Sequence, residues 1–178
     1  MEITLPQAYL LGLIGLLGLV AVVVARQVLR VRKDEARLAK LELQCSGNTK
    51  AEAASLYELG SVQLDKRLFA QAVTTLKKAV KQLDNEPEEA QALVQNALGF
   101  ALAAQQNHND AIRHYRLALR AKAEYPVALN NMAYSLEKQQ KLSDAINTYV
   151  QVLELEPTNP TAIKRLKLLK PEAIPNNK

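Results

Sequence analysis

Few side chains in this chain have the types and spacing that catalysis or metal binding requires. Two histidines lie six residues apart, His108 and His114, and the one cysteine is Cys45. No glycine-rich phosphate loop, paired metal-ligand spacing or nucleophile–base pair accompanies them. We therefore predict a protein that is not an enzyme and has no cofactor, metal site or small-molecule substrate. We expect His114 to lie at the surface rather than to act as a ligand.

The formal charge of +5 is distributed unevenly along the 178 residues. Residues 26–50 have a net charge of +4, residues 51–160 of −2 and residues 161–178 of +4, so the basic character comes from two flanks. Nucleic-acid binding calls for basic residues interleaved with exposed aromatics, and the chain has six tyrosines, two phenylalanines and no tryptophan. We predict no nucleic-acid partner, and we expect the first basic flank to face anionic lipid headgroups.

Residues 1–25 are predicted to form a transmembrane anchor. No charged residue occurs between Ile3 and Ala25, and about 20 apolar residues in a helix span a hydrocarbon core of about 30 Å. A cleaved secretory signal is the alternative, but it would carry its basic residues before the apolar run. Here the basic residues follow it: Arg26, Arg30, Arg32, Lys33 and Arg37. The positive-inside rule then places everything after residue 25 on the cytoplasm-like side of the membrane.

Three glycines in the anchor, Gly12, Gly15 and Gly18, recur on a slowly drifting face of the helix. Small residues let transmembrane helices approach closely, so this face is a candidate for lateral packing. The alternative is that glycine is simply common in such helices. Residues 26–48 are expected to form a basic juxtamembrane helix and hinge, as a solvated spacer rather than a coiled coil, with the hinge at Ser46-Gly-Asn-Thr.

From residue 49 to residue 170 the chain repeats itself. Leu98-Gly99, Ala111 and Tyr115 recur as Met132-Ala133, Ala145 and Tyr149, and a looser copy lies upstream. The period of about 34 residues marks pairs of antiparallel helices that stack on their neighbours. We predict helix pairs at about residues 53–86, 92–125 and 126–159, a capping helix at 160–170 and a flexible tail at 171–178. Thr49 and Glu52 suit a capping box at the start. The predicted fold is all-α: one N-terminal transmembrane helix, an α-solenoid of three helix pairs and a C-terminal cap, whose basic face we expect to be solvated.

These offsets resemble the tetratricopeptide repeat family over residues 53–170. The resemblance rests on small and aromatic residues at the family's positions: Gly60, Gly99, Ala72, Ala111, Ala145, Tyr115, Tyr149, Ala79, Ala118 and Pro157. It implies a protein-binding groove lined by the first helix of each pair, with an extended peptide as ligand. The groove residues that the analogy implies are Tyr57, Ser61, Asn96, Phe100, Asn130, Tyr134 and Glu137. Some of the aromatics could instead pack between helices. Some members of the family bind the C-terminal carboxylate of heat-shock chaperones with Lys, Asn and Arg side chains. The corresponding places here hold no cation: they are Tyr57, Ser61, Ala97, Val127 and Asn131.

Over nearly its whole length the chain also resembles the small photosystem I assembly proteins of cyanobacteria and plastid genomes. The passages that carry this resemblance are Tyr57 to Lys66, Ala97 to Ala101 and Tyr125 to Tyr134. It implies an assembly or stability factor in the thylakoid membrane, with photosystem I subunits or assembly intermediates as partners. The alternatives are a bacterial inner-membrane scaffold for envelope or secretion assembly, and an organellar import or co-chaperone receptor.

Overall fold

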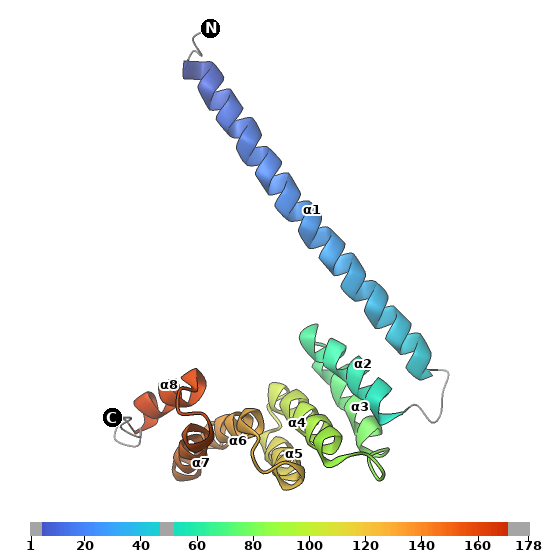
Figure 1. Ribbon diagram of the computed structural model, residues 1–178, viewed down its shortest axis with the longest axis vertical. Helices are drawn as coiled ribbons and strands as arrows, with labels where there is room; N and C mark the ends of the chain where they lie inside the picture. The colour runs from blue at the N-terminus through green and yellow to red at the C-terminus, as the bar shows by residue number, and fades with distance from the viewer. Residues whose placement is uncertain (1–4, 47–51, 171–178) are drawn as a thin grey trace. The chain divides into compact units, whose positions relative to one another are not determined.

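A computed structural model of the protein describes residues 5–46 and 52–170, and the regular elements of those residues are all α-helices. The chain divides into two compact units, residues 1–43 and residues 44–178. Most of helix α1 (Leu5–Ser46) belongs to the first unit, and helices α2 to α8 belong to the second (Figure 1). The predicted fold class is confirmed. Thr49 of the predicted capping box and the predicted tail lie outside the described residues.

Helix α1 is continuous over its 42 residues, a length of about 63 Å at 1.5 Å per residue. It contains a stretch that is long and apolar enough to cross a membrane by length and composition, with a mean hydropathy of 2.3. The apolar side chains from Leu10 to Val24 are exposed. Helix α1 is about twice as long as a hydrocarbon core is thick. The helix therefore runs on through the basic residues after 25, as the sequence predicts, and ends at Ser46, where the hinge was expected.

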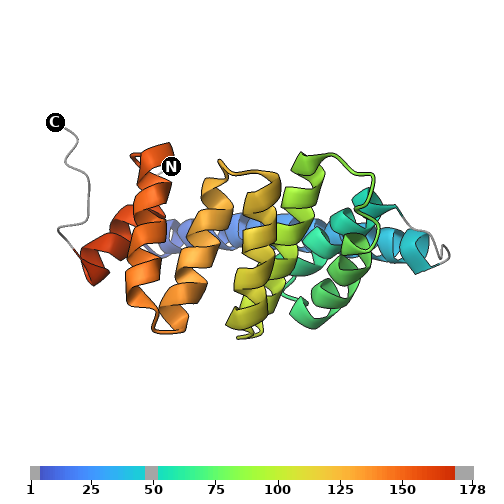
Figure 2. The same cartoon turned by 90° about the horizontal axis from the view of Figure 1, so that it is seen from below.

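The second unit consists of three helix pairs and a single last helix, stacked in chain order (Figures 1 and 2). The pairs are α2 (Ala53–Asp65) with α3 (Phe69–Val80), α4 (Glu88–Ala104) with α5 (His108–Ala121), and α6 (Pro126–Lys138) with α7 (Leu142–Leu155). Helix α8 (Pro160–Leu169) follows and packs against α7. Its first residue, Pro160, stands one full period after Pro126, so α8 lies where a fourth pair would begin.

The two helices of each pair are joined by a turn in which one residue is left-handed. These residues are Arg67 (φ 58°), Gln106 (φ 63°) and Gln140 (φ 60°), at equivalent places in the three repeats. The next residue in each turn donates its backbone N–H to the carbonyl five residues earlier, over 2.8 to 3.0 Å. This hydrogen bond closes a Schellman-type helix end. None of the three residues is glycine, so each turn keeps a conformation that L side chains adopt at a cost.

Within the pairs, glycine allows two helices to approach closely. A Cβ atom added to Gly60 would lie 2.6 Å from a side-chain carbon of Leu76, and one added to Gly99 would lie 2.6 Å from the ring of Tyr115. Both contacts are shorter than carbon atoms tolerate. Close packing of the two helices therefore explains why small residues stand at these positions. The equivalent position in the third repeat holds Ala133 instead of glycine.

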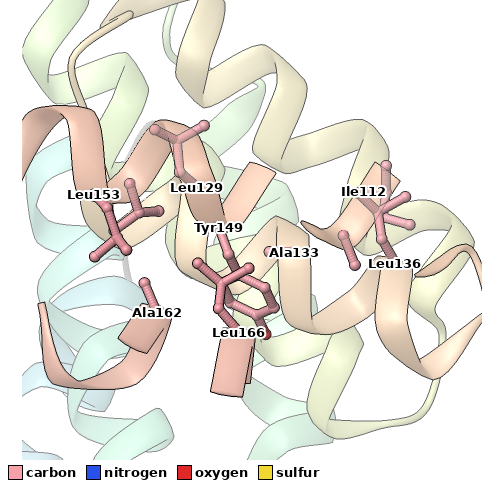
Figure 3. Packing of buried hydrophobic residues seen from close by; sticks show 10 residues of the cluster. Ile112, Leu129, Ala133, Leu136, Tyr149, Leu153, Ala162 and Leu166 are labelled. Carbon is pink, nitrogen blue, oxygen red and sulfur yellow. The ribbon is translucent and has the colours of Figure 1, made fainter. Parts of the chain in front are cut away.

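The core of the second unit is a series of clusters that each reach from one repeat into the next. The first joins α2, α3 and α4, the second joins α3, α4 and α5, and the third joins α5 to α8. In the third cluster the Tyr149 side chain, fully buried, lies among Leu129, Ala133 and Leu166 (Figure 3). Because no repeat covers its own apolar face, the repeats stabilise one another through these shared clusters.

Two helix boundaries differ from those expected. Helix α3 ends at Val80, six residues before the expected end of the first pair at residue 86, and α4 begins at Glu88, four residues before Ala92. The first and second repeats are offset by more than the period that separates the second from the third, and the non-helical segment between them is residues 81–87. The extra residues between the first and second repeats therefore lie in this wide connection. Helix α8 begins at Pro160 as predicted, with the Asn159 side chain accepting the Ala162 N–H at its start.

Candidate protein-binding face

Helices α2, α4, α6 and α8 form one layer of the stack, and α3, α5 and α7 form the other (Figure 1). Neighbouring helices of the first layer touch, since α2 contacts α4 and α4 contacts α6. We call the surface of this layer the A face. The sequence-predicted groove residues all come from it: Tyr57 and Ser61 on α2, Asn96 and Phe100 on α4, and Asn130, Tyr134 and Glu137 on α6.

The predicted aromatic residues fall into two groups. Phe100 and Tyr134 are exposed, with 45% and 38% of their surfaces open to solvent. Tyr57 is half-buried and packs against the first and second core clusters, so it is one of the aromatics that lie between helices. Phe100 and Tyr134 occupy equivalent places in the second and third repeats. Flat, exposed aromatic surface at low entropic cost is suited to holding a partner chain.

The two predicted asparagines bind the stack together. Asn96 Nδ2 donates to the Tyr125 hydroxyl over 3.3 Å, and Asn130 Nδ2 donates to Asn159 Oδ1 over 3.3 Å. In both cases the partner stands directly before the next helix of the layer. Asn96 Oδ1 also accepts from Asn131 Nδ2 over 3.1 Å. The amides expected to serve a ligand therefore already link each helix of the layer to the start of the next, and sequence spacing alone did not reveal that role.

Two further predicted groove residues have partners inside the protein. The Ser61 hydroxyl donates to the Tyr57 carbonyl over 2.8 Å. Glu137 accepts from the Tyr149 hydroxyl over 3.4 Å and lies 3.5 Å from the Arg165 guanidinium. Burial and then the Glu137 carboxylate raise the pKa of Tyr149, so this phenol stays protonated. Glu137 thus acts chiefly to hold Tyr149 and Arg165 in place.

The structure brings together a cluster around Tyr134 that the sequence did not indicate. Lys138 Nζ lies 5.3 Å from the centre of the Tyr134 ring, and the Arg165 guanidinium carbon lies 5.2 Å from it. The His108 ring meets the Tyr134 ring edge-on, at 6.5 Å and 72°. Arg165 belongs to α8, whose basic face was expected to be solvated. Its closeness to Tyr134 depends on how α8 packs, which periodicity does not encode.

A small apolar cavity of about 130 Å³ lies at the other end of the A face. Its wall includes Tyr57 from α2, Leu83 from the connection, and Leu93 and Val94 from α4. Leu93 is exposed. The cavity is large enough for one aliphatic side chain and offers it apolar surface.

The titratable residues considered at the outset do not converge. His114 is buried, which corrects the expectation of a surface residue, and its Nδ1 lies 2.7 Å from Gln95 Oε1. Burial and then Arg113 lower the pKa of His114, so the ring is neutral at pH 7. Cys45 is half-buried, with its Sγ 3.8 Å from the Ser55 carbonyl. Within residues 5–46 and 52–170, no three His, Cys, Asp or Glu side chains are grouped as metal ligands would be.

The residues predicted to act at the membrane all lie on α1. The side chains of Arg26, Arg30, Arg32 and Lys33 are exposed there, and a Cβ added to Gly12, Gly15 or Gly18 would meet nothing within 4 Å. The predicted packing face therefore has room for a neighbouring helix, and its use stays a prediction.

Comparison with known proteins shows which families and proteins this chain resembles. A family model described as the tetratricopeptide repeat matches residues 128–162. The chain is 32% identical over 131 residues to the tetratricopeptide repeat domain-containing protein PYG7, chloroplastic, of Arabidopsis thaliana. The match covers 74% of this chain and 43% of the Arabidopsis protein, so the chain spans less than half of that relative. It is 28% identical over 132 residues to the uncharacterized protein ycf37 of Guillardia theta, covering 74% of each chain.

Among solved structures, the first repeat domain of RPAP3, determined bound to an HSP90 peptide, has the same fold. The TM-score is 0.61 at 23% identity, over 66% of this chain and 89% of that one. This likeness bears on the arrangement of the helices alone, because its sequence identity is low.

Proposed function

We propose that this chain, a tetratricopeptide repeat protein, is a non-enzymatic scaffold that a transmembrane helix tethers to the thylakoid membrane. Its A face holds a partner protein there, and the partner is a photosystem I subunit or assembly intermediate. The observation that carries the proposal is the match to a chloroplastic relative over 131 residues. The resemblance to photosystem I assembly proteins supports the same conclusion. The tether rests on α1, which has the length and the mean hydropathy of 2.3 that a membrane span needs.

The A face has exposed aromatic side chains and a cavity, and both are suited to binding a protein segment. Phe100 and Tyr134 are exposed on adjacent helices of the layer, and the cavity beside Tyr57 adds a place for an apolar side chain. Helices α4 and α6 are fixed to each other by the Asn96–Asn131 hydrogen bond. A partner would therefore meet a surface that is already ordered, and little conformational entropy is lost on binding.

The co-chaperone alternative has less support. A chaperone tail ends in a carboxylate, which other members of the family hold with Lys, Asn and Arg side chains. The corresponding positions here are Tyr57, Ser61, Ala97, Val127 and Asn131. None of these is charged, and Ala97 is buried. An HSP90 peptide is bound by RPAP3, but the likeness to that domain concerns the fold.

Affinity capture from solubilised native membranes tests the proposal. The full chain, the double variant Phe100→Ala/Tyr134→Ala and the control Arg116→Ala are each used as bait, and captured proteins are identified by mass. Arg116 is exposed on α5, outside the A face. We expect photosystem I subunits with the wild type and the control, and their loss with the double variant. Capture of secretion components or import machinery instead would contradict the assignment.

The tether and the role are tested separately. Carbonate washing of membranes should leave the full chain in the pellet and release a chain that lacks residues 1–25. Replacing Gly12, Gly15 and Gly18 together by leucine should weaken co-purification with membrane partners. Deleting the gene should lower the amount of photosystem I per cell, and unchanged amounts under several light regimes would count against the assembly role.

A further inference from the structure

We propose that the cluster of Tyr134, Lys138 and Arg165 binds an acidic side chain of the partner segment that lies on the A face. This inference rests on the proposed function and adds the chemistry of the partner: an extended protein segment with a carboxylate at the α6–α8 end of the A face and apolar side chains over α4.

The first argument is the geometry of the two cations. Both lie against the same ring, at 5.3 Å and 5.2 Å from its centre, within the range of cation–π attraction. They approach from different helices, Lys138 from the last turn of α6 and Arg165 from the middle of α8. The ring is 38% exposed. Two positive groups are therefore held beside an accessible surface before any ligand arrives.

The second argument is the balance of charge. Glu137 lies 3.5 Å from Arg165 and accepts from the Tyr149 hydroxyl, which fixes the guanidinium and neutralises part of its charge. No carboxylate within the described ranges forms an ion pair with Lys138. His108 adds no charge at neutral pH, because burial and then Lys138 lower its pKa. The site has two cations and one engaged carboxylate, so an incoming carboxylate improves the balance.

The third argument is that this arrangement occurs in one repeat. One period before Tyr134, Lys138 and Arg165 the chain holds Phe100, Ala104 and Asn131, none of which is charged. Phe100, like Leu93 and Val127, is exposed apolar surface. The A face thus changes from apolar at α4 to cationic at α8. Such a change in character selects both the sequence and the direction of a bound segment.

A peptide selection tests the inference. Random short peptides displayed on phage are selected on the purified full chain in detergent. The same selection is run on Lys138→Gln and on Lys164→Gln, which removes an equal charge from an exposed position on α8. We expect the wild type and Lys164→Gln to enrich peptides with apolar residues and an Asp or Glu at a fixed spacing. The Lys138→Gln variant should keep the apolar preference and lose the acidic one.

Affinities then test the contact directly. The best-enriched peptide and its Glu→Gln or Asp→Asn analogue are titrated against each variant by fluorescence anisotropy. We expect either change alone to weaken binding about fivefold, as for a partly exposed ion pair, and the two together to add little more. A Tyr134→Leu variant, which leaves both cations in place, should also weaken binding. Additive losses from the peptide and protein changes would overturn the contact.

The remaining outcomes separate this inference from the proposed function. Enrichment of apolar peptides without an acidic residue overturns the acidic site and leaves the scaffold function standing. If no peptide is enriched and no membrane protein is captured, both fail. If phosphatidylglycerol added to the micelles displaces the peptide from the wild type, while Lys138→Gln is insensitive to it, the cluster is a lipid-headgroup site and the inference is wrong.

Discussion

Replacing Gly99 by alanine sets two physical effects against each other. Alanine is the better helix former by about 1 kcal/mol, so propensity alone would stabilise α4. The added Cβ, however, would lie 2.6 Å from Cε1, 2.8 Å from Cδ1 and 3.1 Å from Cζ of Tyr115. All three are ring carbons and move only together. The ring is 1% exposed and belongs to the second core cluster, so it cannot move without displacing packed neighbours.

The packing effect should be the larger. Forcing an additional methyl group into a close-packed core costs about 1–3 kcal/mol, and the contact with a rigid, buried ring favours the upper half of that range. After the gain in propensity, we expect the variant to be less stable by about 1–2 kcal/mol. For a folded unit of this size, such a loss lowers the midpoint of thermal unfolding by about 4–8 °C.

The assay is thermal unfolding of the full chain in detergent, followed by far-ultraviolet circular dichroism. The control is Ala133→Gly at the equivalent place in the third repeat, which loses helix propensity and a buried methyl group. If packing governs both sites, both variants melt below the wild type. A Gly99→Ala variant that melts at or above the wild type would refute the reasoning, because propensity would then have prevailed.

Three other outcomes follow from the same contacts. Gln106→Gly should raise the denaturant midpoint of unfolding, because glycine relieves a φ of 63°, whereas Gln105→Gly, at φ −88°, should lower it; denaturant melts of the two variants check this. Asn96→Ala should lower the free energy of unfolding by about 1–2 kcal/mol in the same assay, since both polar atoms of the amide have partners. Asn130→Ala should cost less, because Asn130 Oδ1 is buried without a partner among the described residues. His114 has a lowered pKa in the folded chain, so the unfolded chain takes up its proton first; the free energy of unfolding should fall as the pH drops below about 6.5. His114→Gln should reduce that fall, and an unchanged pH profile would exclude His114 as its source.

The helix pairs could be predicted because similar residues recur at a constant spacing along the sequence. The constant spacing between small and aromatic positions specifies the helix pairs, and Pro126 and Pro160 mark where two helices begin. The left-handed turn residues carried no such signal, since Arg67, Gln106 and Gln140 are not residues that favour positive φ. There the closure of the turn imposes the conformation.

The surroundings of the candidate site residues could be predicted only in part, because residue type does not tell whether a polar group already has a partner. Asn96 and Asn130 have the composition of a ligand-binding row, yet their amides link the repeats. A signal was present: the partners Tyr125 and Asn159 themselves stand one period apart, as the two asparagines do. The cations around Tyr134 could not be found this way. Arg165 lies on α8, and Asn131, one period before it, is uncharged, so the repeat pattern gives no sign of a cation there.

The period is constant from the second repeat through the third to α8, so the junction after Asn159 is a place where the molecule could be lengthened. Both have the same turn, the same asparagine link to the following helix and the same spacing to the next repeat position. A duplicate of residues 126–159 inserted after Asn159 would meet α7 as α8 does now, and it would extend the A face by one helix. The junction between the first and second repeats offers no such splice site. Tyr57 replaces the linking asparagine there, and residues 81–87 interrupt the period. The third repeat is thus the module from which longer versions of this scaffold could be built.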